Sequence, residues 1–364
     1  MIGALATPSR AGTPGLRLPA PITIETGTAR FQIERDGLVR RLPRRVLPFP
    51  PDVAWFPGTG VWYAIRHRHL VVGRWEKPLW RSSGEYRARY QFGVVTIGER
   101  TVAYSYRRHG AEWLYVSPLA GRERRVARNE FPLGWTRGGF YAYRYGGRQL
   151  LLRGKTGALE ATVVRMPATY FYDRTTESLY FIARGTLWRA QGAAVKAMAS
   201  LAGVGLPPRK PDAEIVPLGS LLELLTNGRL IVLHADGTLF AATRLPDPHE
   251  AISSEVAVAP DASAVAYTVA IGTSTNEETV YVLRAGARAA IALNREPAEL
   301  GGCVSGATVR WHGRWLLYSA TGGYLAVIDS ARKRPQIDLS AIAQRLSGNR
   351  NGISAYWSGH GPQP

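Results

Sequence analysis

Basic and aromatic side chains in the first quarter of the chain are the strongest candidates for chemistry. Guanidinium groups pair bidentately with phosphates and carboxylates, and aromatic rings stack on nucleic-acid bases. Arg, Tyr and Trp also dominate the energetically important positions of protein interfaces. The pattern therefore predicts a binding face for a protein or anionic envelope partner, with nucleic acid as an alternative. The candidate binding residues are Arg40, Arg41, Arg44, Arg45, Arg66, Arg68, Trp75 and Trp80.

The same charges have a simpler interpretation. Residues 1–150 hold 25 basic and 10 acidic side chains, whereas residues 151–364 hold 21 and 17, so most of the net charge of +19 lies in the first part. A field of one sign attracts anionic partners. However, only five of the basic residues are Lys and the rest are Arg. A GC-rich genome would produce the same excess of Arg without selection for a binding site. Charged outer strands also keep exposed sheet edges from pairing with other chains.

Three motifs were tested for metal, nucleophile and phosphate chemistry. His67 and His69 alternate in one strand, but no nearby Asp or Glu supplies a third ligand, so no metal is predicted. Residues 134–138 have the glycines of a serine-hydrolase motif but carry Thr136 at the centre, which predicts a turn. Gly154-Lys155-Thr156 ends like a phosphate loop, yet Gln149 stands where the first glycine belongs, which predicts a hairpin turn.

Four carboxylates and the single cysteine are further candidates for chemistry. Cys303 begins an apolar run and is interpreted as a small buried side chain. Four carboxylates fall near the openings of the repeats described below, where an enzyme acting on a glycan or small molecule could use a pair of them. Asp261 is explained more simply as a turn residue. The four are Asp52, Asp173, Glu223 and Asp261.

Composition and the first residues bear on fold class and location. Of 364 residues, 45% are hydrophobic and 20% charged, which is ordinary globular usage and argues against disorder or a collagen-like fibre. The sequence contains no apolar stretch of about 18 residues, so no membrane-spanning helix is predicted. Residues 1–20 are predicted to be a flexible tail. Residues 1–12 resemble the end of a secretory signal with small residues around Ala11, so export to the periplasm, envelope or medium is predicted, with a cytoplasmic tail as the alternative.

A repeat begins near residue 50. Each unit opens with an aromatic or aliphatic cluster and continues through short apolar strands separated by polar turns. The openings lie near residues 55, 95, 135, 172, 222, 258 and 311. This spacing is typical of four-stranded propeller blades, and it predicts about seven blades, with six or eight as alternatives.

Two further features concern the ends of the repeat and its helices. Tyr356-Trp357-Ser358 is predicted to be one more opening strand, which the hairpin of residues 22–33 would complete, so that the propeller spans residues 21–364. The Ala-rich residues 190–204 are predicted to form a short helix. Asp338–Leu346 is predicted to form another, with Asp338 as its N-cap.

One copy of the repeat resembles a known family. Val258-Ala259-Pro260-Asp261-Ala262, followed by Val265-Ala266-Tyr267, is similar to the WD-like repeat of TolB-type β-propellers, whose usual opening is Trp-Ser-Pro-Asp-Gly. Residues 55–58 are a weaker copy, and the resemblance covers about residues 50–330. It implies protein–protein contacts, often in the cell envelope, and no catalysis by the propeller. No functional residue is carried over from it.

These observations predict an all-β protein, a single β-propeller with a short C-terminal helix. The predicted function is a non-catalytic interaction scaffold, exported and monomeric, that presents its Arg-rich face to an anionic or protein partner. No catalytic residue, metal or cofactor is predicted. The enzyme and the nucleic-acid-binding propeller remain the alternatives, because fold alone does not establish function.

Overall fold

Short antiparallel strands joined by tight turns make up nearly all of the part of the chain that the structure describes. The structure is a computed structural model. It describes residues 16–26, 29–43, 54–56, 61–74, 77–82, 92–98, 100–108, 111–119, 121–206, 213–226, 228–246, 256–271, 277–293, 307–320, 323–347 and 353–358.

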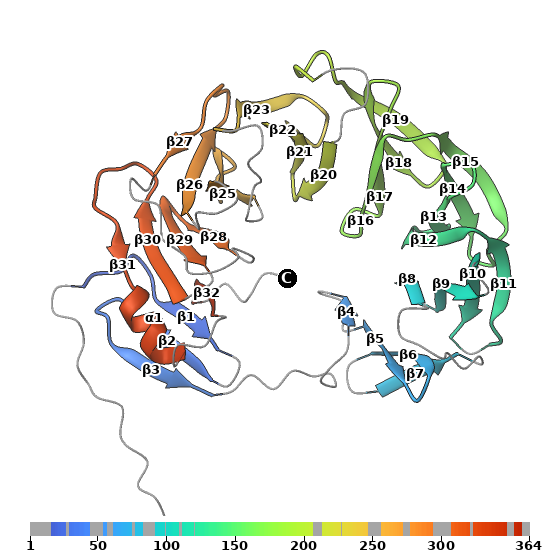
Figure 1. The fold of residues 1–364 in the computed structure, drawn as a ribbon, viewed down its shortest axis with the longest axis horizontal. Helices are drawn as coiled ribbons and strands as arrows, with labels where there is room; N and C mark the ends of the chain where they lie inside the picture. The colour runs from blue at the N-terminus through green and yellow to red at the C-terminus, as the bar shows by residue number, and fades with distance from the viewer. Residues whose placement is uncertain are drawn as a thin grey trace, which may run out of the picture. The chain divides into compact units, whose positions relative to one another are not determined.

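Within these residues the strands form eight four-stranded antiparallel sheets. Seven of the sheets follow chain order without a crossover, and the eighth joins strands from the beginning and the end of the chain (Figure 1). That eighth sheet has the order β3-β2-β1-β32 and consists of β1 (Ile22–Glu25), β2 (Arg30–Ile33), β3 (Val39–Leu42) and β32 (Ser354–Trp357).

The next four sheets contain the strands between residues 54 and 200. The first two are β4 (Ala54–Phe56), β5 (Val61–Arg66), β6 (His69–Arg74) and β7 (Lys77–Arg81), then β8 (Phe92–Ile97), β9 (Thr101–Arg108), β10 (Ala111–Pro118) and β11 (Arg124–Arg128). The other two are β12 (Glu130–Trp135), β13 (Gly139–Arg144), β14 (Gln149–Gly154) and β15 (Leu159–Arg165), then β16 (Thr169–Asp173), β17 (Ser178–Ala183), β18 (Thr186–Gln191) and β19 (Ala194–Ser200).

The last three sheets follow the same pattern. They are β20 (Ala213–Leu218), β21 (Leu221–Thr226), β22 (Arg229–His234) and β23 (Leu239–Arg244), then β24 (Ala257–Val258), β25 (Ala264–Ile271), β26 (Glu277–Arg284) and β27 (Ile291–Ala292), then β28 (Thr308–His312), β29 (Trp315–Ala320), β30 (Tyr324–Asp329) and β31 (Ile337–Asp338). The described helix is α1 (Ser340–Ser347).

The chain divides into two compact units. The terminal unit comprises residues 1–45, 218–234 and 239–364, and the central unit comprises residues 46–217 and 235–238. In both units, buried apolar side chains fill the space between each sheet and the next in the series. In the central unit, Tyr104 packs with Leu70 across one such layer and Phe181 packs with Tyr141 across another. In the terminal unit, Tyr318 and Val282 belong to one interlayer cluster.

This serial stacking of four-stranded antiparallel sheets is the blade arrangement of a β-propeller. The predicted all-β propeller class is therefore confirmed. The described part of the chain holds eight sheets, which is the higher of the two alternatives to the predicted seven. The seven repeat openings correspond to seven sheets, although the opening near residue 222 falls on β21, the second strand of its sheet, rather than on β20.

The eighth sheet is built from both ends of the repeat region. β1 pairs with β32 in antiparallel register, with Ile22 opposite Trp357. Trp357 is almost fully buried, and its indole N–H donates to the Arg310 carbonyl at 3.0 Å. Leu18 and Ala20, within the predicted flexible tail, are buried in the same cluster. The boundary between a tail of residues 1–20 and a propeller that begins at residue 21 remains a prediction.

Aspartates start several of the tight turns. In each case a carboxylate oxygen accepts the backbone N–H of the residue two positions later, which satisfies a donor that the strands leave unpaired. Asp261 holds both the N–H and the hydroxyl of Ser263 in this way, as the sequence predicted for a turn residue. Equivalent bonds are made by Asp36, Asp173, Asp236 and Asp329.

One predicted helix is wrong and the other is present. Residues 190–204 are not helical: Ala194–Ser200 form β19, which pairs with β18 across a turn at Gly192. Alanine has the highest intrinsic helix propensity, but backbone pairing with the neighbouring strand β18 overrides it. The second helix, α1, begins at Ser340, two residues after Asp338, whose carboxylate accepts the Ser340 N–H at 2.8 Å. Leu339 and Ala343 are buried in the cluster that includes β1 and β32.

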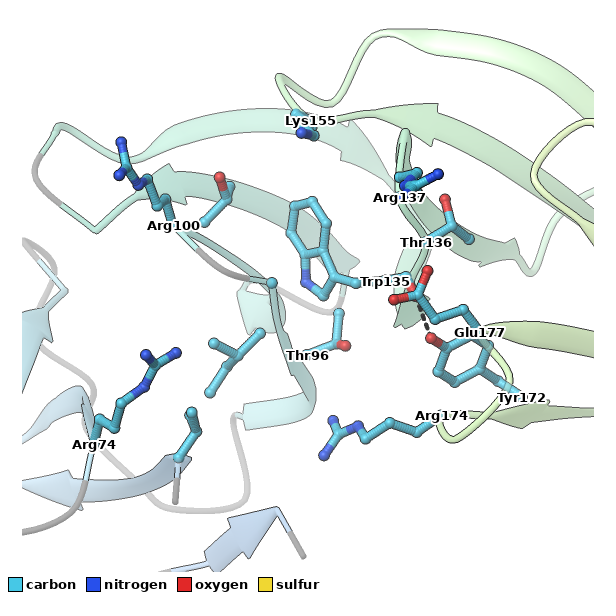
Figure 2. Close-up of a pocket in the computed structure, with 14 residues that line it drawn as sticks. Arg74, Thr96, Arg100, Trp135, Thr136, Arg137, Lys155, Tyr172, Arg174 and Glu177 are labelled. Atoms are coloured by element: carbon cyan, nitrogen blue, oxygen red, sulfur yellow. Dashed lines mark hydrogen bonds between the residues drawn. The ribbon is translucent and has the colours of Figure 1, made fainter. Parts of the chain in front are cut away.

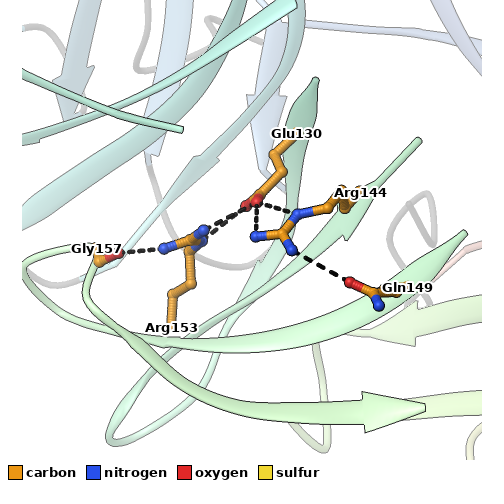
Figure 3. Close-up of polar contacts among 5 residues, drawn as sticks. All are labelled: Glu130, Arg144, Gln149, Arg153 and Gly157. Carbon is orange, nitrogen blue, oxygen red and sulfur yellow. Dashed lines mark hydrogen bonds and ion pairs between the residues drawn. The ribbon is translucent and has the colours of Figure 1, made fainter. Parts of the chain in front are cut away.

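A buried ion cluster ties together three strands of one central sheet (Figure 3). The Glu130 side chain on β12 is fully buried, and the Arg153 side chain on β14 is 6% exposed. Arg153 donates to both oxygens of Glu130 at 2.8 and 2.9 Å and to the Gly157 carbonyl at 2.6 Å. Arg144 on β13 donates to Glu130 at 2.7 Å and to Gln149 at 3.2 Å. The cluster therefore secures the start of β12 and the β14–β15 turn together.

Replacing Glu130 with Gln is expected to destabilise the protein by about 3–5 kcal/mol, because two guanidinium groups lose the carboxylate that compensates their desolvation. Urea denaturation followed by circular dichroism measures the change.

The matched control is Glu34→Gln. Glu34 pairs with Arg40, whose side chain is 65% exposed, so its loss is expected to cost about 0–1 kcal/mol. Equal destabilisation by the two substitutions would show that the buried cluster has no special structural role.

Candidate anion-binding site

A cavity of about 680 Å³ lies within the central unit. Its walls come mainly from the ends of the first strands of three consecutive sheets and from the turns that follow them. The lining residues there are Gly98, Arg100 and Thr101 near the end of β8, Trp135–Arg137 at the end of β12, and Tyr172, Arg174 and Glu177 at the end of β16. Arg74 at the end of β6 and Lys155 in the β14–β15 turn complete the polar lining (Figure 2). Because the same kind of turn is used in each sheet, stacking the sheets brings these side chains to one place.

Among the residues that the structure describes, five cations and one carboxylate line this cavity. The carboxylate is Glu177, and the cations are Arg74, Arg100, Arg137, Lys155 and Arg174. Arg100, Arg137 and Arg174 are 37 residues apart in both intervals, and each lies in the turn between the first and second strands of its sheet, in three successive sheets. A cavity lined by an excess of one sign of charge raises the local concentration of counter-ions, so this lining favours an anion.

Glycines allow two aromatic rings to lie directly against neighbouring strands. A methyl group at Gly134 would lie 1.9 Å from the Tyr172 ring, and one at Gly98 would lie 2.9 Å from the Trp135 ring. Any larger residue at Gly134 would therefore displace Tyr172. The Tyr172 hydroxyl donates a hydrogen bond to the Trp135 carbonyl, which links the first strands of two sheets at the wall of the cavity (Figure 2).

Burial changes the titration of two groups in the lining. It lowers the pKa of the Arg174 guanidinium from its usual value, because removal from water disfavours the charged form. It raises the pKa of the Tyr172 hydroxyl, and the Glu177 carboxylate raises that pKa further. Tyr172 therefore stays protonated at neutral pH and remains a hydrogen-bond donor.

The Trp135 indole N–H is a buried donor without a hydrogen-bond partner among the described residues. Leaving such a group unpaired costs about 1–3 kcal/mol. An acceptor oxygen on a ligand would recover part of that cost. The lining thus combines cations, an unused neutral donor and the hydroxyls of Thr96 and Thr101, a set suited to holding oxyanions.

The predicted arginine cluster at residues 40–45 is only partly described. Arg40 and Arg41 are exposed on β3 in the terminal unit. Arg40 donates through Nε to Glu34 at 2.8 Å, which neutralises part of its charge. Arg44, Arg45 and Trp75 lie outside the described residues. The binding role of these residues remains a prediction.

The other predicted binding residues lie in the central unit, outside the 680 Å³ cavity. Arg66 and Trp80 line a separate, more open hollow of about 470 Å³ together with Arg81. Trp80 is 8% exposed and its indole N–H donates to Ser117 at 3.1 Å, so it serves mainly as core. Arg66 stacks over the Trp62 ring at 5.4 Å, and Arg68 is exposed in the following turn.

The histidines and carboxylates for which the sequence predicted no metal or catalytic role have structural roles where they are described. The predicted alternation of His67 and His69 in one strand is wrong, because His67 is exposed in the turn between β5 and β6. His69 begins β6 and is buried, with Nδ1 2.9 Å from the Ser82 carbonyl. No group of metal-ligating side chains is found in the described part of the chain. Asp173 is buried and caps its turn, and Glu223 is buried on β21. Asp52 and Cys303 lie outside the described residues.

Sequence reasoning missed the cavity because it judged its residues one motif at a time. Residues 134–138 do form a turn, as predicted, with the Thr136 N–H donating to the Gly139 carbonyl at 2.8 Å. Gly154 also lies in a hairpin turn, as predicted. Yet these turns supply Trp135, Arg137 and Lys155 to the cavity. The 37-residue spacing of three arginines was the available signal.

The fold and the site define a β-propeller with a cationic cavity in its central unit. No known protein family matches the sequence, and no curated protein sequence matches it. Similar solved structures include AztD from Citrobacter koseri (10% identity, 92% of this chain and 97% of that chain, TM-score 0.47) and BamB from Moraxella catarrhalis (13%, 79% and 85%, 0.44). TolB from Acinetobacter baumannii is a third (11%, 60% and 62%, 0.32). Similarities this low say nothing of function.

No helix in the described ranges has the length and apolar character needed to cross a membrane.

Replacing Gly134 with Ala is expected to destabilise the central unit by about 1–3 kcal/mol, because the added methyl group forces the Tyr172 ring away from β12. Thermal unfolding measures the effect.

Gly138→Ala is the control, since a methyl group there meets nothing within 4 Å. If both substitutions lowered the melting temperature equally, close packing of Tyr172 on Gly134 would not be the cause.

Proposed function

We propose that the protein is a non-catalytic binding β-propeller whose central unit takes an anionic ligand, or an anionic group of a partner, in the 680 Å³ cavity. The observation that carries the proposal is the excess of five cations over one carboxylate among the described residues of the cavity lining. Four of the five cations are arginines, which stay charged at all physiological pH values and bind oxyanions through two parallel hydrogen bonds.

The size and lining of the cavity support binding of a small ligand or a single protruding group. A volume of about 680 Å³ lies within the range of small-molecule sites, about 300–1,000 Å³. The backbone of the lining is held by paired strands and short turns, so the ordering cost of binding is limited to the exposed side chains of the cations.

Binding is favoured over catalysis by the acid–base groups present. Among the described lining residues, Glu177 is the one carboxylate, whereas glycoside hydrolysis uses two that face each other. The enzyme acting on a glycan or small molecule remains the alternative function. Hydrolysis of glycan substrates by the purified protein, lost on Glu177→Gln, would favour that alternative.

Export to the cell envelope is part of the proposal. It is supported by the small residues around Ala11, which resemble a cleavage site for a secretory signal. Amino-terminal sequencing of the protein from its native host tests it. A mature chain that begins near Gly12 is expected, and an intact Met1 would contradict export.

Replacing Arg100 and Arg137 together with Gln is expected to weaken citrate binding at least tenfold, because each charged hydrogen bond contributes about 1.5–3 kcal/mol. Isothermal titration calorimetry at low ionic strength measures the affinity.

The matched control is Arg122→Gln with Arg165→Gln, which removes the same charge from exposed positions of the central unit outside the cavity. This variant is expected to bind citrate within about twofold of the wild type, since screening weakens distant surface charges. If the wild type bound neither citrate nor any phosphate anion, or if the two variants lost binding equally, the proposal would be overturned.

The cluster at residues 40–45 is proposed as a second, surface contact for an anionic partner. Changing Arg40, Arg41, Arg44 and Arg45 to Ser is expected to lower the salt concentration needed for elution from a sulfated resin by more than the control variant Arg122, Arg165, Arg288 and Arg334 to Ser. Elution of both variants at the same salt concentration would show that the cluster is no special binding face.

A further inference from the structure

We infer that the ligand of the 680 Å³ cavity carries linked phosphate groups, an oligophosphate of two or more units. This inference deepens the proposed function and rests on it. Figure 2 shows the cations on several sides of the cavity, drawn from separate turns and strand ends.

Charge balance is the first argument. With Glu177 subtracted, the five cations of the described lining leave an excess of four positive charges. A single phosphate group carries about −1.5 to −2 at neutral pH and would neutralise at most half of that excess. Two or three linked phosphates would neutralise nearly all of it. An equal number of carboxylates needs a larger carbon framework in the same volume.

The identity of the cations is the second argument. Arginine presents a planar fork of donors that matches phosphate oxygens, whereas lysine acts as a compact point charge. Arg100, Arg137 and Arg174 come from equivalent turns of three successive sheets and form a regular series in the sequence. A regular series of forked donors suits a ligand whose acceptor groups also repeat.

The neutral donor is the third argument. The buried Trp135 N–H has no partner among the described residues, and it lies in the turn that also carries Arg137. A phosphate held by Arg137 has several free oxygens, so one of them can accept from the indole. A monovalent anion held by the arginine alone would leave this donor unused.

The test compares anions of increasing phosphate number by calorimetry. Orthophosphate, pyrophosphate and tripolyphosphate are the probes, with citrate as the carboxylate reference. The affinity is expected to rise at least tenfold from orthophosphate to tripolyphosphate, and tripolyphosphate is expected to bind at least tenfold more tightly than citrate. Adenosine triphosphate is a further arm: tighter binding than tripolyphosphate identifies a nucleotide, and equal or weaker binding identifies the oligophosphate chain itself.

Two variants locate the interaction. Trp135→Phe keeps the aromatic ring and removes the N–H, so tripolyphosphate binding is expected to weaken about five- to tenfold. Trp113→Phe, on β10 and away from the cavity, is the control and is expected to change nothing. Far-ultraviolet circular dichroism checks that both variants are folded.

The outcomes separate the inference from the proposed function. In one outcome, the double variant Arg100→Gln with Arg137→Gln loses citrate binding, but the wild type binds the three phosphates with equal affinity. This outcome overturns the inference of an oligophosphate ligand and leaves the proposal of an anion-binding cavity standing. In another outcome, neither Trp135→Phe nor the double arginine variant weakens tripolyphosphate binding. The ligand then binds outside the cavity, and the oligophosphate inference is also overturned. Failure of every anion to bind overturns both.

Discussion

Face-to-face packing of neighbouring sheets is the constraint on which this structure depends. A four-stranded sheet with apolar side chains on both faces cannot bury them by itself, so each sheet needs a neighbour. Tyr104, Tyr141 and Tyr267 show the consequence: each is almost fully buried and belongs to a cluster shared by two consecutive sheets. The resulting series of sheets repeats not only the core but also the turns, and it is the turns that carry the polar groups.

The cationic cavity follows from that repetition. Equivalent turns of stacked sheets come together, so an arginine placed once per repeat produces a group of arginines at one site. These arginines remain in contact with solvent, since Arg100 and Arg137 are exposed and Arg174 is half-buried. Close packing secures the strands beside them. Gly134 accepts the Tyr172 ring, and the Tyr172 hydroxyl bonds to the strand that carries Trp135. The buried Glu130–Arg153 pair further secures the same sheet, and Arg153 also binds the turn that presents Lys155.

Periodicity was sufficient to predict the fold class from sequence, because alternating apolar strands and polar turns recur at a blade-like interval. The propeller class, the turn role of Asp261 and the helix near residue 340 were predictable from local signals. The Ala-rich segment 194–200 was not, since its strand conformation depends on pairing with β18 rather than on its own preference. The cavity was not predicted either: Trp135, Arg137 and Lys155 look like turn residues, and only the stacking of sheets shows that they share a site.

The pairing of β1 with β32 has a consequence for how the chain is made. A ribosome delivers β1 to β3 early, yet their sheet lacks its fourth strand until Trp357 has been synthesised. The central unit, by contrast, is nearly continuous in the sequence, from residue 46 to residue 217. The sheets of the central unit can assemble on the nascent chain before β32 is available to pair with β1. The last strand therefore completes the sheet that the first strands begin. A chain truncated before β32 would leave apolar side chains of β1 exposed, which would promote aggregation and proteolysis.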